Sequence, residues 1–296
     1  MVLKCKRPVC QSNFNECNKM IQAGALYIVA TPIGNLEDIT LRAIRILKEV
    51  GLIAAEDTRH TRQLLNALEI RTPLISLHEH NEEKKSLSLI LRMVEGLSIA
   101  HVSDAGTPGL SDPGYRLIRA AIAHDIPVVP IPGVSAVITA LSASGLPMNR
   151  FLFRGFLPGK AAGRRQQLAE LARENGTLVF YESPNRLLSA LRDVYDLMGN
   201  RDVVICRELT KVYESFIRGP VQAVIQTLEG RRIKGEVTLL ISGCPEAKPE
   251  WSDAAIIQRF MELQQQHELS HRDCADRMAA ETGLPRSRIY KLTVPG

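Results

Sequence analysis

The segment Ser103-Asp104-Ala105-Gly106-Thr107-Pro108 follows an apolar run, Ile99 to Val102, that is typical of a buried strand. Two more loops of small residues, Thr31–Asn35 and Pro132–Ala136, follow similar runs. In an open α/β sheet, ligands bind at the carboxyl ends of the strands, so we expect these three loops to converge. Small residues let the backbone approach a planar ligand, and Asp104 suits ribose hydroxyls or a cationic group.

Strand-like and helix-like runs alternate along the first half of the chain, which predicts a mostly parallel sheet covered on both faces. Pro113 is expected in the first turn of one helix, and Asn81 is expected to cap another. We predict two α/β domains and a small helical module in which Gly283 turns and Pro285 opens a helix, as in a helix–turn–helix. The expected parts are an extension over residues 1–23, predicted to be disordered, domains over 24–147 and 148–244, and the module over 250–296.

Composition narrows the class of protein. The 296 residues are 45% hydrophobic and 23% charged, which is ordinary for a globular chain. No apolar run is long enough to cross a membrane and no secretory signal is visible, so we expect a cytoplasmic protein. The six cysteines fit no common zinc pattern. Rossmann, P-loop, serine-hydrolase and zinc-protease motifs are all absent, which argues against those enzyme classes.

A set of segments taken in order along residues 24–243 carries a resemblance to a known family: Tyr27–Thr40, Ala55–Arg59, His78–Asn81, Val102–Pro108, Ser111–Gly114, Pro130–Ala136, Gly155–Pro158, Phe180–Pro184, Arg207–Lys211 and Lys234–Glu236. The chain resembles the ribosomal branch of the tetrapyrrole-methylase superfamily. The resemblance implies transfer of a methyl group from S-adenosylmethionine to the ribose 2′-hydroxyl of a cytidine in the decoding region of 16S rRNA.

The resemblance implies that S-adenosylmethionine lies folded in a cleft between the two α/β domains. It also implies a homodimer that acts on 16S rRNA or the 30S subunit, away from membranes. A methyl group on a sulfonium is strongly electrophilic, so no metal is expected. The implied cofactor-binding residues are Pro32 in the first loop, Asp104, Ala105, Gly106 and Thr107 in the second, Ser135 and Ala136 in the third, and Tyr181 and Leu209 from the second domain.

A ribose hydroxyl is a weak nucleophile unless a base or hydrogen-bond acceptor takes its proton. Among the acidic and histidine side chains near the expected cleft, we predict Glu182 as this acceptor. Arg59 and Lys211 are predicted to support it, by binding phosphate or polarising the hydroxyl.

Two segments are candidates for RNA contact. The first is a basic cluster beside Phe153 and Phe156, and the second is the helical module, which is equally well suited to docking or dimerisation. Two other functions remain open: methylation of a small tetrapyrrole or corrin ring, and a non-catalytic regulator that binds nucleic acid through the C-terminal helices. The residues of the basic cluster are Arg154, Lys160, Arg164 and Arg165.

Overall fold

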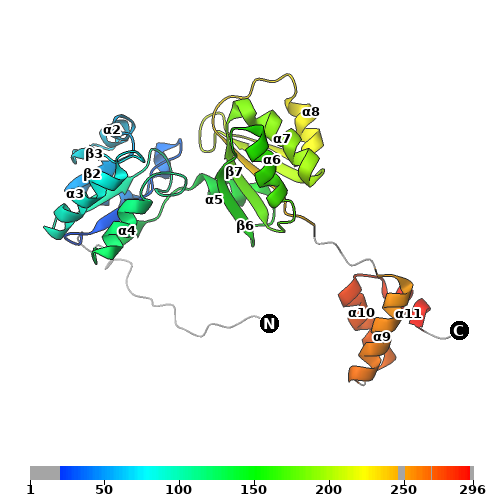
Figure 1. Ribbon diagram of the computed structural model, residues 1–296. Helices are drawn as coiled ribbons and strands as arrows, with labels where there is room; N and C mark the ends of the chain where they lie inside the picture. The colour runs from blue at the N-terminus through cyan, green and yellow to red at the C-terminus, as the bar shows by residue number, and fades with distance from the viewer. Residues whose placement is uncertain (1–20, 246–250, 268, 294–296) are drawn as a thin grey trace. The chain divides into compact units, whose positions relative to one another are not determined.

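The computed structural model describes residues 21–245, 251–267 and 269–293, which fall into two compact units (Figure 1). The first unit runs to Cys244 and the second begins at Pro245. Most of the extension predicted over residues 1–23, up to residue 20, lies outside the described residues. The fold class predicted from the sequence is confirmed, because two α/β sheets and the C-terminal helices are all present.

The first sheet has five parallel strands in the order β3-β2-β4-β1-β5. Alternate residues of its central strands face opposite sides, so Tyr27 and Ile53 pack with α1 and α2, whereas Leu26 and Leu52 pack with α3 and α4. Helices therefore cover both faces, as the alternation predicted. The bounds are β1 Leu26–Val29, α1 Leu41–Glu49, β2 Leu52–Ala55, α2 Thr58–Ala67, β3 Leu74–Ser76, α3 Glu82–Val94, β4 Ile99–Val102, α4 Tyr115–Ala123 and β5 Val128–Ile131, with a 3₁₀ turn at Leu36–Asp38.

The second sheet has the order β6-β7-β10-β8-β9, and only β6 and β7 run parallel. Three helices, α6 to α8, pack on one face through a core around Phe180 and Leu191. The strand β9 and the helix α8 were missed in the sequence, because Ser215–Pro220 is only half-buried and alternates weakly. The bounds are β6 Phe151–Phe156, α6 Ala161–Glu170, β7 Thr177–Glu182, α7 Pro184–Met198, β8 Asp202–Arg207, β9 Ser215–Pro220, α8 Val221–Leu228 and β10 Val237–Ile241.

The helix α5, Ala136–Ser144, joins the two sheets in the chain. It lies within the range predicted for the first domain, yet it runs beside the second sheet (Figure 1). There Val137 and Leu141 pack against Val179 and Leu240. The Arg218 guanidinium also donates to the carbonyl of Ser144 at 3.1 Å. The loop that precedes α5 thus lies between the first sheet and the face of the second sheet that is opposite α6 to α8.

The second unit consists of three helices, α9 Asp253–His267, α10 His271–Thr282 and α11 Arg286–Thr293. Gly283 closes α10 in the left-handed conformation, and Pro285 precedes α11, so the predicted turn is confirmed. Arg286 pairs with Asp276 and Arg288 pairs with Asp253, which engages two of the cations expected to face nucleic acid.

The start of α4 differs from the sequence-based expectation. Pro113 was predicted in the first helical turn, but the helix begins at Tyr115 and Gly114 occupies the cap with φ 132°. The reason is Glu82, a buried residue at the start of α3. Its carboxylate accepts hydrogen bonds from the backbone amides of Gly114 at 3.1 Å, Arg116 at 2.8 Å and Leu117 at 3.1 Å, and these bonds set where α4 begins.

The cap of α3 also differs from the sequence-based expectation. Asn81 stands at the predicted cap position, but its side chain makes no capping bond to α3. Instead Asn81 Oδ1 accepts from the amide of His78 at 3.0 Å and closes the preceding turn.

We predict that Glu82→Ala lowers the free energy of unfolding by about 2–4 kcal/mol, because three amides at a buried helix start lose a charged acceptor. Urea unfolding followed by circular dichroism measures the change. Glu83→Ala is the matched control, since Glu83 is exposed and makes only a surface ion pair with Arg116, worth about 0–1 kcal/mol. Equal stability of the two variants would contradict the capping role.

Candidate functional site

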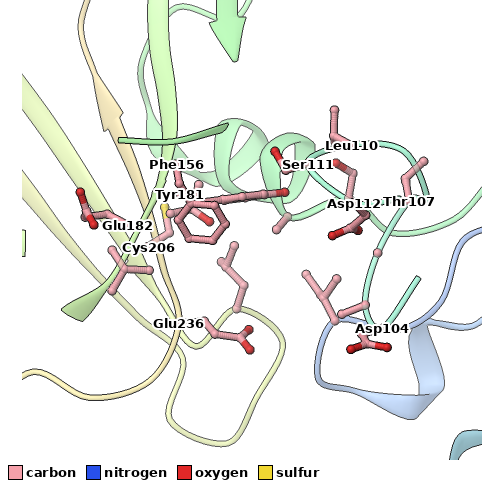
Figure 2. Close-up of a pocket in the computed structure, with 18 of the residues that line it drawn as sticks. Asp104, Thr107, Leu110, Ser111, Asp112, Phe156, Tyr181, Glu182, Cys206 and Glu236 are labelled. Carbon is pink, nitrogen blue, oxygen red and sulfur yellow. The ribbon is translucent and has the colours of Figure 1, made fainter. Parts of the chain in front are cut away.

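A cavity of about 480 Å³ lies within the first unit, where the loops of the first sheet meet the face of the second sheet opposite α6 to α8 (Figure 2). Each sheet contributes one wall. The lining residues are Ile33, Glu56, Asp104, Ala105, Gly106, Thr107, Leu110, Ser111, Asp112, Ser135 and Ala136 on the first wall, and Phe156, Tyr181, Glu182, Ser183, Pro184, Cys206, Leu209, Gly235, Glu236, Val237 and Thr238 on the second.

The three loops expected to converge are bonded directly to one another. The backbones of Thr31 and Gly106 exchange two hydrogen bonds, of 2.9 and 3.0 Å, as an isolated bridge. Thr107 Oγ1 then donates to the carbonyl of Val134 at 3.1 Å. Gly106 has φ 80°, where a side chain would be strained, and a Cβ there would lie 3.4 Å from Ile33. The first wall is therefore a single tied surface.

Three carboxylates gather on this first wall. Burial raises the pKa of Glu56, with the charges of Asp112 and Asp104 adding to the effect. Burial also raises the pKa of Asp112, and the neighbouring Asp104 raises it further. The backbone amide of Asp57 donates to Asp104 Oδ1 at 3.0 Å. The cluster carries more negative charge than its surroundings neutralise, which suits a cationic ligand.

The second wall is aromatic and apolar. Tyr181 packs against Phe153, with ring centroids 5.0 Å apart, and against Phe156, with centroids 5.4 Å apart. Burial, helped by the charges of Asp112 and Glu236, raises the pKa of Tyr181 to about 12. Burial likewise raises the pKa of the Cys206 thiol to about 12, so this thiol is no nucleophile at neutral pH.

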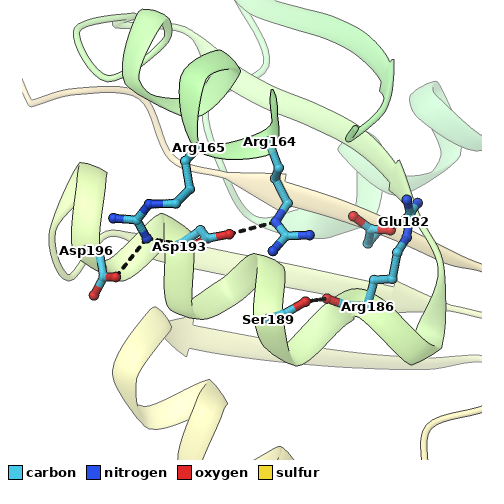
Figure 3. Close-up of polar contacts among 7 residues, drawn as sticks. All are labelled: Arg164, Arg165, Glu182, Arg186, Ser189, Asp193 and Asp196. Atoms are coloured by element: carbon cyan, nitrogen blue, oxygen red, sulfur yellow. Dashed lines mark hydrogen bonds and ion pairs between the residues drawn. The ribbon is translucent and has the colours of Figure 1, made fainter. Parts of the chain in front are cut away.

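Glu182 is buried on the second wall, on the side of Tyr181 away from Asp104 and Asp112 (Figure 2). Its Oε1 pairs with Arg186 at 2.7 Å and accepts from the amide of Ser183 at 2.6 Å. Its Oε2 has no partner among the described residues. One oxygen of the predicted proton acceptor is thus occupied, and the other is available (Figure 3).

The other two predicted catalytic residues lie outside the cavity lining. The Arg59 side chain is 90% exposed and pairs with Asp57 at 2.8 Å, and this pairing holds the pKa of Asp57 well below its usual range. Lys211 binds Glu208 at 3.0 Å and Glu236 at 3.2 Å. Among the predicted cofactor-binding residues, the lining includes all except Pro32, whose neighbour Ile33 takes that place.

Two of the four residues of the basic cluster predicted as an RNA surface, Arg164 and Arg165, are engaged in ion pairs. Arg164 is buried and its Nε pairs with Asp193 at 2.7 Å (Figure 3). Arg165 pairs with the same Asp193 at 2.6 Å and with Asp196 at 3.0 Å. The expectation was wrong for Arg164, because α7 presents an acidic residue to α6, a contact that spacing along the chain does not reveal.

Several lining residues were not singled out in the sequence. Asp112 lies in a segment, Ser111–Gly114, that carries the family resemblance but received no role. A carboxylate flanked by Pro113 and Gly114 after a glycine-rich loop was the available signal. Glu236 likewise lies in a segment of the resemblance, Lys234–Glu236, without having received a role, and Phe156 was considered only for RNA contact. Cys206 gave no signal, since it looks like an ordinary strand residue.

The sequence of this chain matches a known family and its members. The pattern of the family described as Tetrapyrrole (Corrin/Porphyrin) Methylases covers residues 25–225. The chain belongs to this methylase family. The methylase is 48% identical to a protein of Halalkalibacterium halodurans named "Ribosomal RNA small subunit methyltransferase I", over 91% of this chain and 94% of the relative. The resemblance to the ribosomal branch is thereby confirmed.

Solved structures support the fold of the methylase. Uroporphyrin-III-C-methyltransferase from Thermus thermophilus superposes with a TM-score of 0.53 and 22% identity, over 74% of this chain and 94% of that chain. A structure from the same organism described as complexed with S-adenyl homocysteine gives a TM-score of 0.52 and 18% identity, over 73% and 96%. At such identities the likeness establishes the fold alone.

Two kinds of feature are absent from the described part of the methylase. No group of three or more His, Cys, Asp or Glu residues there is placed to hold a metal ion. No helix there combines the length and the apolar character needed to cross a membrane.

We predict that Asp112→Asn raises the melting temperature at pH 7.5, and that the gain shrinks as the pH falls toward 4. A carboxyl whose folded-state pKa is raised contributes stability below its unfolded pKa and loses it as the pH rises through the folded value. The amide removes that unfavourable charge. Thermal scans across this pH range measure the effect.

Glu79→Gln, at an exposed position outside the cavity, is the control for the Asp112 experiment. A gain for Asp112→Asn that is equal at pH 7.5 and pH 4 would show that the substitution acts through something other than this charge.

Proposed function

We propose that this methylase transfers a methyl group from S-adenosylmethionine to the ribose 2′-hydroxyl of a cytidine in the decoding region of 16S rRNA. The relatives named ribosomal RNA small subunit methyltransferase I point to the RNA, at 48% identity in one case. The carboxylate-lined cavity carries the proposal for the cofactor, since its charge matches a sulfonium. We propose action in the cytoplasm on 16S rRNA or the 30S subunit, as a homodimer.

The cavity residues fit S-adenosylmethionine in three ways. Asp104 and the other carboxylates of the first wall match the positive charge of a sulfonium and an amino group. Ser135 Oγ is buried at the cavity without a partner among the described residues, which leaves it free for a ligand. Leu209 and Tyr181 offer an apolar surface to an adenine. S-adenosylmethionine supplies an electrophilic methyl group there, and Ala105, Gly106, Thr107 and Ala136 form the close-fitting backbone wall.

The target hydroxyl needs a proton acceptor, and the structure favours Asp112 over Glu182 for this task. Burial raises the pKa of Asp112, which makes its carboxylate a stronger base near neutral pH. Asp112 also faces the cavity from the wall that carries the proposed cofactor-binding loops (Figure 2). Glu182 keeps Oε2 for a hydrogen bond to the ligand, while Arg186 and Ser183 hold its other oxygen.

The charged residues outside the cavity are proposed to bind RNA. Arg59 projects into solvent from the start of α2, directly after the strand that leads to Glu56. The side chain of Lys211, on the loop after β8, packs closely against Gly34 of the first loop. We propose that both exchange their ion pairs, with Asp57 for Arg59 and with Glu208 and Glu236 for Lys211, for contacts to RNA phosphates. Such contacts would orient the target ribose without reading sequence. Pro32, one residue before the lining, is proposed to support the first loop.

The decisive experiment is transfer of tritiated methyl from S-adenosylmethionine to 16S rRNA, both free and assembled in 30S subunits. We expect incorporation at one cytidine 2′-oxygen, located by alkaline-hydrolysis resistance and mass spectrometry. Absence of incorporation into both substrates, with S-adenosylmethionine still bound by calorimetry, would overturn the RNA assignment. Absence of binding as well would overturn the proposed cofactor.

In the same assay, at saturating cofactor, Asp112→Asn should lower kcat by about 10²–10⁴-fold, because a general base typically contributes that much. Glu182→Gln should lower it by less than about 10-fold, since it removes one hydrogen-bond acceptor and the charge that pairs with Arg186 but not the proposed base. The opposite ranking would assign the proton to Glu182. Melting temperatures of both variants show whether the fold is intact.

Removing residues 245–296 should leave the affinity for S-adenosylmethionine unchanged, because every cavity-lining residue belongs to the first unit. We expect weaker RNA binding and a weaker dependence of affinity on salt. The slope of log affinity against log salt concentration should shrink by about one for each phosphate that the shortened protein no longer neutralises. Filter binding at several salt concentrations measures both. Unchanged RNA affinity and slope would show that the helical unit serves docking or dimerisation instead.

A further inference from the structure

A second hollow of about 580 Å³ lies beside the main cavity and has no role in the function proposed above. Two loops form it, one directly after β1 and one directly after β8. It is more open to solvent than the main cavity, so a ligand there would keep one face exposed. The lining residues are Gly34, Asn35, Leu36, Thr210, Lys211, Val212 and Tyr213.

The two loops approach each other closely at Gly34, and side-chain hydrogen bonds brace the second loop. A Cβ at Gly34 would lie 2.4 Å from Cγ of Lys211, so only glycine lets the lysine stem cross the first loop. Glu208 Oε1 accepts from Lys211 Nζ at 3.0 Å and from the amide of Glu236 at 2.9 Å. Thr210 N donates to Glu214 Oε2 at 2.7 Å. The hollow is therefore a built feature of the fold.

The backbone of the second loop is strained at two positions. Glu208 has φ 53° and Thr210 has φ 65°, which is the left-handed region that non-glycine residues rarely adopt. Such strain persists only where surrounding contacts enforce it, and it concentrates at ligand-binding positions. Thr210 Oγ1 is also buried with no partner among the described residues. Both observations indicate a loop shaped for binding.

The strained loop holds two apolar side chains in solvent. Val212 is 93% exposed and Tyr213 is 73% exposed, which is unusual for residues fixed on a rigid loop. The backbone carbonyl of Tyr213 accepts from Arg207 at 3.3 Å, so the residue is anchored while its ring stays uncovered. The exposed ring of Tyr213 lines the same hollow as Lys211 and Asn35. Such a combination of aromatic, basic and amide side chains is typical of surfaces that stack a nucleobase.

The hollow continues the main cavity along both loops. Ile33 lines the cavity and Gly34 lines the hollow, and the same change occurs between Leu209 and Thr210. Lys211 also reaches across to Glu236, which lines the main cavity, at 3.2 Å. One ligand can thus place a reactive group in the cavity and an attached planar group in the hollow.

We infer that this hollow receives the base of the nucleotide whose ribose is methylated, a pyrimidine swung out of its RNA stack. Tyr213 stacks on the ring. Asn35 Oδ1 accepts from the amide of Glu37 at 3.1 Å, which leaves its Nδ2 to donate to a pyrimidine carbonyl. The inference rests on the proposed function, because it names the partner surface for that same RNA.

The test compares three variants in the methyl-transfer assay with 30S subunits. Tyr213→Ala should lower kcat/KM for the RNA by about 10- to 100-fold, which corresponds to the loss of one stacked base. Tyr213→Phe keeps the ring and should stay within about threefold of wild type. Tyr115→Ala removes a similarly exposed tyrosine from α4, outside both hollows, and should change nothing. Affinity for S-adenosylmethionine should be the same in all three.

A direct readout is ultraviolet crosslinking of the wild-type complex, followed by trypsin digestion and mass spectrometry. We expect a nucleotide adduct on the peptide of residues 212–218, which lies between Lys211 and Arg218. Wild-type kinetics for Tyr213→Ala would overturn the inference. So would a loss of activity that light scattering traces to a change in oligomeric state, because the residue would then serve an interface between copies.

The two levels of the proposal fail differently. If wild-type protein transfers no methyl group to rRNA, the proposed function fails and the inference falls with it. If wild-type protein is active while Tyr213→Ala is equally active, the function stands and only the hollow loses its assignment.

Discussion

The paired backbone hydrogen bonds between Thr31 and Gly106 are the constraint on which the rest of the site depends. They join loops that leave two neighbouring parallel strands, β1 and β4, and the Thr107 hydroxyl extends the tie to the third loop at Val134. A side chain at position 106 would strain the left-handed backbone. Because these bonds are formed by the main chain, the surface that faces the ligand is rigid before any ligand arrives.

That rigid wall carries charge at a cost to the fold. Glu56 and Asp112 are partly buried near Asp104, and burial together with like charges raises both of their pKa values. Such an arrangement is unfavourable in the folded protein alone and becomes favourable when a cation is bound. The apolar cores around Tyr27, Leu26 and Phe180 stabilise the unit that bears this cost.

The second sheet contributes complementary properties. The face opposite α6 to α8 presents Tyr181 to the cavity, with Leu209 beside it, while α5 packs on another part of that face. The loop after β8 then continues beyond the cavity and holds Tyr213 outside it. Charge on one wall, an apolar surface on the other and an aromatic rim together suit a ligand with a cationic centre next to an RNA strand. Neither sheet alone provides all three properties.

The sequence by itself determined the local structure wherever burial is periodic and a loop is short. Ile99–Val102 was predicted at its observed bounds, because a strand buried on both faces reads as a short apolar run between turn residues. The three small-residue loops were predicted to converge, since parallel strands end at one edge. The half-buried strand β9 lacked such a signal and was missed.

Only the tertiary structure decided which charged groups face the cavity. Arg164 turned inward to Asp193, and Glu182 was paired with Arg186. Asp112 emerged as the carboxylate opposite Tyr181, and Glu82 set the start of α4. The physical reason is that an ionised side chain is placed by partners distant in the chain and by the loss of water around it. Periodicity along the sequence shows which side chains are buried, but it shows neither the distant partners of a charged group nor how much water that group loses.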